Sequence, residues 1–327
     1  MSKVVRFHET GGPEVLRIEE LPAGRPGPGE MRLRVQAIGL NRAEAMFRAG
    51  RYVRVPKFPS VIGMEATGVV EELGEGVQGF ALGDRVCALP SIGPEYGVYA
   101  EQAIVPARGV IAAPPGLTPV QAASIWMQYF TAYAIIEVAH VGVGDFVLIP
   151  AASSSVGLAA IQLANWAGAV PIALTRHSAK AAALRAQGAQ HVIASTEVDV
   201  VAEVMRITGG KGVRAAFDPV GGPYIEKLAL AMADEGVVFV YGGLSEQPTP
   251  YPHWTAAMKG LSIRGWVASA IWNKPERFTR VKEAILLGLA QGHLQPVISR
   301  TFPLSQIVEA HRYLESNEQI GKIVVTV

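Results

Sequence analysis

The stretch of residues 145–169 constrains the fold more than any other part of the sequence. It begins with an apolar run, continues through a turn of very small residues, and ends in an Ala-rich segment whose apolar residues recur every three or four positions. The apolar run is typical of a buried parallel strand, and the later spacing predicts a helix. Small residues in the turn would let a phosphate approach the backbone amides where the helix begins. The stretch therefore predicts a strand–turn–helix unit that binds a dinucleotide.

The turn alone is a weak motif. Where a Gly-x-Gly-x-x-Gly template has three glycines, this chain has Ala152, Ser154 and Gly157, so the turn also fits an α/β protein that binds no nucleotide. Its serines supply hydroxyl donors for a pyrophosphate, but serine is also common at the N-cap of any helix. The expected pyrophosphate contacts are Ser153, Ser154, Ser155, Val156 and Gly157.

Composition excludes several classes of protein. The 327 residues are enough for two domains. A net charge of +1 implies no attraction to nucleic acid, and no apolar run reaches membrane-spanning length. The first residues lack the apolar core of a signal peptide, and the single cysteine, Cys87, excludes an internal disulfide and a multi-thiolate metal site. We expect a cytoplasmic protein without nucleic-acid or membrane partners.

The order of predicted elements indicates two kinds of structure. Residues 1 to about 110 contain short alternating strands between Gly- and Pro-rich turns, which predict a compact barrel-like fold. Residues 118–138 have a helical pattern with Pro119 in the first turn, and strands then alternate with helices. The strands are expected at 147–151, 170–175, 191–194, 213–217 and 237–241, and the helices from 155 and at 178–187, 198–207 and 223–233. This alternation predicts an α/β fold with a doubly wound parallel sheet.

Three more elements are expected toward the C-terminal end. A strand at 261–267 would lie at the edge of the sheet, where it is available for pairing between subunits. Residues 277–291 predict an amphipathic helix and residues 321–327 a last strand.

Several short segments, taken in order, resemble the zinc-independent quinone oxidoreductase (zeta-crystallin-like) branch of the medium-chain dehydrogenase/reductase superfamily. They are residues 12–16, 39–41, 48–52, 63–68, 83–86, 131–133, 151–157, 218–221 and 321–324. The resemblance implies a GroES-like catalytic domain, residues 1–122 and 298–327, interrupted by a Rossmann domain, residues 123–297. It also implies an active site in the cleft between the domains, NADPH-dependent reduction, and a homodimer.

Zinc-dependent members of that superfamily carry a Gly-His-Glu pattern and cysteine ligands. Here the pattern reads Gly63-Met64-Glu65, and Asn41 stands near the position of the first cysteine. Zinc requires three or four nitrogen, sulfur or oxygen ligands, and the seven histidines form no His-x-x-x-His pair. We therefore expect no metal. Reduction of an electron-poor acceptor does not need the Lewis acid on which alcohol oxidation depends.

Residues after the second Rossmann strand bear on the choice of cofactor. NAD-selective folds place an acid there to bind the adenosine ribose. In this chain Thr175, Arg176 and Lys180 occupy the segment instead, and cations of this kind bind a 2′-phosphate. The sequence predicts NADPH in preference to NADH, although a solvated loop has the same composition. The tyrosine that often follows the third strand in the family is absent from residues 192–195.

The resemblance also assigns candidate site residues. Asn41 and Thr131 match positions near the nicotinamide, and Tyr52 matches a tyrosine that donates a proton in related enoyl-thioester reductases. Each has a structural alternative: a turn-forming Asn, helix packing for Thr131, and an amphipathic ring at a domain edge for Tyr52. Lys322 matches a Gly-Lys pair near the C-terminus that reaches the cofactor. Further cofactor contacts are expected after the fourth and fifth strands, at Val220, Gly221, Tyr241, Gly242 and Gly243.

Two features leave the acceptor open. Met46 replaces a tyrosine common in the family, which makes the expected pocket more apolar. A local run of cations, Arg48, Arg51, Arg54 and Lys57, either attracts an anionic group or is an ordinary solvated face. The main hypothesis is NADPH-dependent transfer of hydride to a quinone or an α,β-unsaturated carbonyl. An enoyl-thioester reductase and a non-catalytic NADPH-binding structural or sensor protein are the alternatives.

Overall fold

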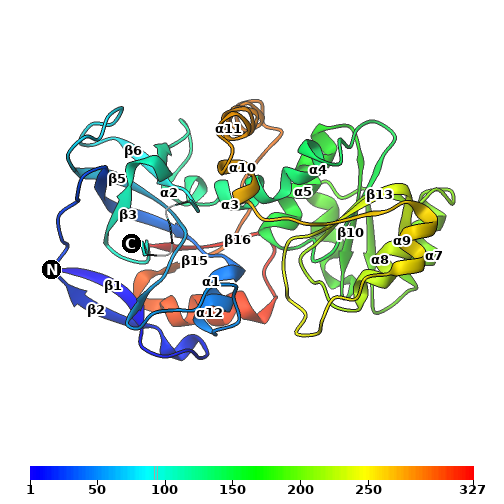
Figure 1. Ribbon diagram of the computed structural model, residues 1–327, viewed down its shortest axis with the longest axis horizontal. Helices are drawn as coiled ribbons and strands as arrows, with labels where there is room; N and C mark the ends of the chain where they lie inside the picture. Colours follow the sequence, from blue (N-terminus) through cyan, green and yellow to red (C-terminus); the bar gives the residue numbers. More distant parts are fainter. Residues whose placement is uncertain (92, 94) are drawn as a thin grey trace. The chain divides into compact units, whose positions relative to one another are not determined.

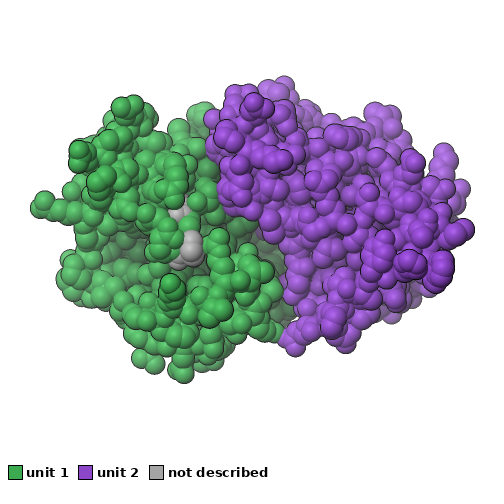
Figure 2. Space-filling view, in the orientation of Figure 1, with its two compact units in different colours: residues 1–127, 296–327 green, residues 128–295 purple. Residues whose placement is uncertain are grey.

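The structure, a computed structural model, describes residues 1–91, 93 and 95–327. The chain forms two compact units, which Figure 2 shows in different colours: unit 1 contains Met1–Met127 and Pro296–Val327, and unit 2 contains Gln128–Gln295. Unit 2 therefore interrupts unit 1 in sequence.

Unit 1 is rich in β-structure (Figure 1). Its larger sheet has the strand order β15–β16–β3–β5–β6–β8, and β7 also pairs with β3. A smaller sheet has the order β2–β1–β4. The strands are β1 (Ser2–Phe7), β2 (Arg17–Leu21), β3 (Glu30–Gly39), β4 (Ser60–Val61), β5 (Glu65–Leu73), β6 (Arg85–Ala88), β7 (Gln102–Pro106), β8 (Val110–Ala112), β15 (Ile298–Pro303) and β16 (Lys322–Thr326). The barrel-like closure of this unit stays a prediction.

Unit 1 contains two helices that were not predicted from the sequence. They are α1 (Arg42–Arg48) and α12 (Ile307–Ser316). Both pack on the strands through buried side chains such as Ala45 and Ile307. Short 3-10 turns lie at Pro13–Val15, Ala107–Gly109 and Leu304–Gln306.

Unit 2 contains a six-stranded sheet in which every neighbouring pair is parallel. Its order is β11–β10–β9–β12–β13–β14, so the chain starts in the middle, winds to one edge, and then returns to wind to the other. The predicted doubly wound parallel sheet is confirmed. The strands are β9 (Phe146–Ile149), β10 (Val170–Thr175), β11 (His191–Ala194), β12 (Val213–Asp218), β13 (Met232–Val240) and β14 (Ser262–Gly265).

The helices of unit 2 bury apolar side chains against this sheet. One core joins residues of β9 to β13 with those of α7, α8 and α9, for example Leu148, Val204 and Leu228, while α5 packs on β9 and β10. The helices are α4 (Ala134–Glu137), α5 (Ser155–Trp166), α6 (Ala181–Ala186), α7 (Val200–Ile207), α8 (Tyr224–Ala231), α9 (His253–Lys259), α10 (Ser269–Trp272) and α11 (Pro275–Ala290), with a 3-10 turn at Ser178–Lys180.

The helical pattern of residues 118–138 is divided among three short helices. The structure has α2 (Pro119–Ala122), α3 (Trp126–Ala132) and α4 in its place. A capping box at Thr118 starts α2, and the Ser124 hydroxyl bonds back to the carbonyl of Val120 at 2.7 Å. The Met127 amide, in the first turn of α3, donates to Glu65 at 3.0 Å.

No helix in the described ranges is both long enough and apolar enough to span a membrane.

Candidate functional site

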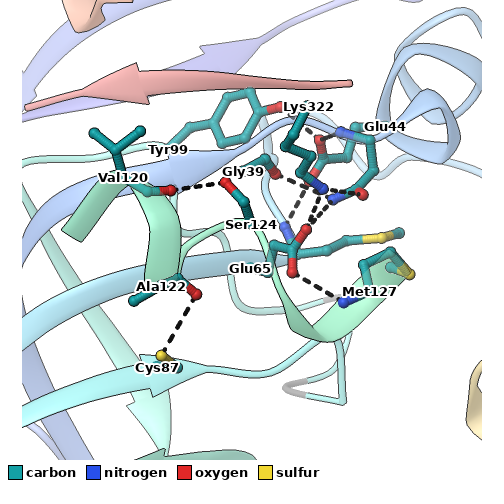
Figure 3. Close-up of polar contacts among 12 residues, drawn as sticks. Gly39, Glu44, Glu65, Cys87, Tyr99, Val120, Ala122, Ser124, Met127 and Lys322 are labelled. Atoms are coloured by element: carbon teal, nitrogen blue, oxygen red, sulfur yellow. Dashed lines mark hydrogen bonds and ion pairs between the residues drawn. The ribbon is translucent and has the colours of Figure 1, made fainter. Parts of the chain in front are cut away.

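A buried ion pair in unit 1 joins residues from distant parts of the chain (Figure 3). Lys322 of β16 and Glu65 of β5 are each 1% exposed and form an ion pair. The Lys322 ammonium also donates to Asn41 Oδ1 at 2.7 Å. Asn41 Nδ2 donates to the Gly39 carbonyl at 3.1 Å and to Glu65 Oε1 at 3.3 Å. Both ends of the Asn41 amide are therefore engaged within the protein.

Strand register brings these groups together. β3 lies between β5 and β16, with Gly39 paired to Glu65 on one side and to Val324 on the other. A Cβ atom at Gly39 would lie 2.9 Å from Lys322 Cε and 2.1 Å from the Ala123 carbonyl. Only glycine leaves room for the lysine side chain to reach the glutamate.

A second buried carboxylate, Glu44 of α1, lies in the same unit. Its Oε2 accepts from the backbone amide of Asn41 at 2.8 Å and from the Tyr99 hydroxyl at 2.6 Å. Its Oε1 accepts from the backbone amide of Met64 at 2.7 Å. Burial raises the pKa of Glu44 to about 7, against the lowering effect of these hydrogen bonds and of the Lys322 charge.

The sequence analysis missed Glu44, Glu65 and Tyr99 as parts of the candidate site. A signal was present for Glu44, because it stands three residues after Asn41 in the Asn-x-x-Glu pattern of a capping box. Glu65 and Tyr99 are fixed by long-range pairing, for which the sequence carries no local signal.

The predicted basic cluster is only partly at the surface. Arg48 is 1% exposed and donates to the Gly11 carbonyl at 3.1 Å and to His311 Nδ1 at 2.8 Å, so the alternative of a solvated face does not hold for this residue. Arg54 and Lys57 are exposed. Tyr52, the predicted proton donor, is half-buried in the loop that follows α1.

The part of the chain that the structure describes contains no group of three His, Cys, Asp or Glu side chains placed to hold a metal ion.

The predicted dinucleotide turn of unit 2 lies at the carboxyl end of β9. Ser154 is the N-cap of α5, and its hydroxyl accepts from the Gly157 amide at 3.0 Å. A Cβ atom at Gly157 would lie 2.6 Å from the Ala152 carbonyl, so this glycine allows the first turn of α5 to pack on the end of the strand. Ser155 and Val156 begin α5.

Cationic residues follow β10, next to this turn. The Lys180 ammonium donates to the Ser153 hydroxyl at 3.1 Å, which joins the two loops. Thr175 ends the strand and Arg176 is exposed after it. One acidic side chain also reaches this segment, since Glu197 accepts from the Ser178 amide at 2.8 Å.

The turns after β12 and β13 complete this end of the sheet. Asp218 accepts from the amides of Val220 and Gly221 at 2.8 and 3.0 Å, and burial raises its pKa. Tyr241 stacks on Phe217 with ring centroids 4.2 Å apart.

The Tyr241 hydroxyl is an unsatisfied donor at the same end of the sheet. It is buried and has no hydrogen-bond partner at normal distance among the described residues, although Ser154 is close enough to lower the Tyr241 pKa slightly against the larger raising effect of burial. Gly242 follows, where a Cβ atom would lie 2.5 Å from the Pro219 carbonyl; it and Gly243 are exposed.

Thr131 takes part in packing within unit 2. It is 6% exposed in α3, and its carbonyl accepts from Trp266 Nε1 at 2.9 Å.

These residues fit a phosphorylated dinucleotide. A pyrophosphate suits this end of the unit 2 sheet. The 12-residue helix α5 begins there, the strand order reverses there, and the turns contain glycines. Arg176 and Lys180 are suited to a 2′-phosphate, and the buried Tyr241 hydroxyl has a donor to offer.

Comparisons with known proteins agree with both units. The family model "Alcohol dehydrogenase GroES-like domain" matches residues 27–115, and the model "Zinc-binding dehydrogenase" matches residues 187–325. A 2-haloacrylate reductase of Burkholderia sp is 32% identical over 98% of this chain and 97% of its own length. A quinone oxidoreductase of Homo sapiens is 31% identical over 99% of this chain and 98% of its own.

The chain belongs to the quinone oxidoreductase branch of the medium-chain dehydrogenase/reductase superfamily. The family predicted from the order of short segments is therefore confirmed. The structure of this chain is similar to the crystal structure of Escherichia coli quinone oxidoreductase complexed with NADPH. The TM-score is 0.91, with 27% identity over 99% of this chain and 100% of the other.

Proposed function

We propose that this protein is a zinc-independent reductase that uses NADPH to transfer a hydride to a quinone or to the β-carbon of an α,β-unsaturated carbonyl. Relatives named quinone oxidoreductase and 2-haloacrylate reductase support this activity. The observation that carries it is the carboxyl end of the unit 2 sheet, where the N-cap of α5 is joined by the Lys180–Ser153 hydrogen bond to the cationic segment after β10.

The residues of unit 2 have separate binding roles in this proposal. The amides at the start of α5 and the hydroxyls of Ser153 and Ser154 bind the pyrophosphate, and Arg176 and Lys180 bind the 2′-phosphate. The turns after β12 and β13 bind the ribose and nicotinamide part.

The residues of unit 1 orient the acceptor. NADPH, when bound, supplies the hydride. Asn41, held by Lys322 and Glu65, is assigned to the part of unit 1 that positions the acceptor; to donate to the acceptor oxygen, its amide would have to exchange one of its present hydrogen bonds. The proton that completes the reduction comes from water or from the Tyr52 phenol. Lys322 acts through Asn41, because its ammonium is bound within the network.

The enoyl-thioester alternative loses part of its basis. Its only sequence support was the run of four cations, and Arg48 is turned into the interior. Crotonyl-CoA therefore enters the test as a competing acceptor.

Arg176→Ala tests the cofactor assignment. We expect the KM for NADPH to rise about tenfold with kcat and NADH turnover little changed, because a charge-assisted phosphate contact is lost. The assay follows NADPH and NADH consumption with 1,4-benzoquinone, 9,10-phenanthrenequinone, a simple enone and crotonyl-CoA. Arg185→Ala is the matched control, because Arg185 is also an exposed arginine but lies on α6.

If NADPH binds but none of the acceptors is reduced, the result would favour a non-catalytic NADPH-binding protein.

We also propose a homodimer that pairs through the open edge of β14. The cytoplasmic location stays a prediction.

A further inference from the structure

Among the described residues, the hydrogen-bond partners of the Glu44 carboxylate are all donors. The amides of Asn41 and Met64 and the hydroxyl of Tyr99 all point at its carboxylate. A carboxylate accepts all three hydrogen bonds, whereas a protonated carboxyl group needs an acceptor of its own. The ionised form therefore matches this environment and the neutral form does not.

The direction of the hydrogen bonds behind Tyr99 is fixed as well. Arg48 is a donor only, so His311 Nδ1, 2.8 Å away, must accept. Burial and the nearby arginines lower the pKa of His311 to about 3, so its neutral ring carries the proton on Nε2. That nitrogen lies 3.3 Å from the Tyr99 hydroxyl, which leaves Tyr99 to donate to Glu44.

The charged and titratable groups around Glu44 come from several elements. Arg48 lies on α1 itself, Glu65 on β5, Tyr99 before β7, His311 on α12 and Lys322 on β16. Lys322 and the hydrogen-bond donors favour the carboxylate, and burial opposes it. The balance leaves the charge of Glu44 sensitive to pH near neutrality.

We propose that Glu44 is a positioning residue of the reductase: its carboxylate, oriented through Tyr99 by the Arg48–His311 pair, fixes the main chain at Asn41 and Met64 in the form that supports turnover. Protonation of Glu44 leaves a hydroxyl facing donors and releases that main chain. The inference rests on the proposed function, because Asn41 is a proposed contact of the reacting groups.

Glu44→Gln tests the proposal through the pH profile. In the native protein we expect kcat/KM to rise with pH through a midpoint near about 7, where Glu44 ionises. In Glu44→Gln this step disappears and kcat/KM falls about tenfold at high pH, with the dissociation constant of NADPH unchanged. Glu309→Gln, an exposed glutamate on α12, is the matched control and keeps the native profile.

Tyr99→Phe provides a second, signed test that does not depend on the stability of the first variant. Removal of one donor to the carboxylate should move the midpoint to higher pH, a shift that loss of packing alone does not produce. A native midpoint in Tyr99→Phe, or a native pH step in Glu44→Gln, would overturn the proposal.

Infrared difference spectroscopy separates this proposal from the proposed function. The native protein should show the carbonyl band of a buried protonated carboxyl group that vanishes as pH rises through about 7, and Glu44→Gln should lack it. If the band is present but no acceptor is reduced, the proposed reductase activity and the role of Glu44 in turnover would be overturned, whereas the titration of Glu44 would stand. Absence of the band from the native protein would overturn the titration and the positioning role, whatever the activity.

Discussion

Buried charge in unit 1 is concentrated in four side chains. Glu44, Glu65, Arg48 and Lys322 are each 1% exposed, and each has a partner of opposite charge or a set of hydrogen bonds. Removing one member of such a group leaves the others buried without compensation, which costs more than the net worth of the interaction itself. Substitutions that keep shape and hydrogen bonding are therefore the informative ones.

His311→Gln tests how burial of a neutral imidazole affects stability. The pKa of His311 is lowered to about 3 in the folded protein. The neutral imidazole therefore contributes fully to the free energy of unfolding above the ordinary pKa of histidine, and this contribution is lost as pH falls below that value. Between about pH 8 and pH 5, His311 alone should cost the native protein about 2 kcal/mol. Glu44, whose pKa is raised, acts in the opposite direction over this interval.

Relative to the native protein, His311→Gln should thus gain about 2 kcal/mol when pH is lowered over that interval. Urea unfolding at both pH values measures the difference. His253→Gln, at an exposed histidine, is the matched control variant. An unchanged difference for His311→Gln would show that the imidazole titrates normally.

Single-residue predictions succeed where a chemical signal is local. The serines around Ser154 and the lysine at 180 follow from strand–turn–helix spacing, and the structure brings Ser153 and Lys180 together. The partners of Asn41 do not follow from spacing, because Lys322 and Glu65 meet it only through strand register. Residue types alone do not encode that register.

The packing of β3 against its neighbours depends on a close approach at Gly39. β3 accommodates the Lys322 side chain only because Gly39 has no Cβ atom. The neighbouring carbonyl of Ala123 belongs to the segment between α2 and α3, so a side chain at this position would press on two elements at once.

Gly39→Ala should destabilise the protein by about 3 kcal/mol or more, because the methyl group overlaps backbone. Thermal unfolding measures the change, and reductase turnover should fall as the Lys322–Glu65 pair is displaced. Gly142→Ala is the control, because no other atom lies within 4 Å of the Cβ position of this glycine. Equal melting temperatures for the two variants would contradict the argument.

Hydrophobic periodicity predicted the strands of unit 2 well, since they are apolar runs between helices, but it did not predict α9 and α10. The helical pattern over residues 118–138 is interrupted for a physical reason. The side chains there are suitably apolar, but the Met127 amide bonds to Glu65, a tertiary contact that overrides local propensity. The missed α1 and α12 are short, and their buried faces become visible only from the packed core.

For the whole molecule, the open edge of the unit 2 sheet is the feature with a quaternary consequence. β14 is the last strand of its sheet, and an unpaired edge of this kind invites pairing with a second chain.

Ser262→Lys should weaken the proposed homodimer, because it adds a charge beside Arg264 on an exposed part of β14 in both copies. Sedimentation velocity of the native protein should give a dimer, and the variant should shift toward monomer by about tenfold or more in dissociation constant. Gln291→Lys, at an exposed helix end, controls for added charge. A native protein that sediments as a monomer at all concentrations would contradict the dimer.

The position of β16 also has a consequence for synthesis on the ribosome. β16 completes the sheet of unit 1, yet it is made only after all of unit 2 has emerged. Unit 2 is continuous in sequence and can reach its native pairing first. Until Lys322 arrives, the nascent unit 1 holds Glu65 without its counter-ion and β3 without its neighbour β16, so we expect chaperones to act on this N-terminal segment before the rest of the chain.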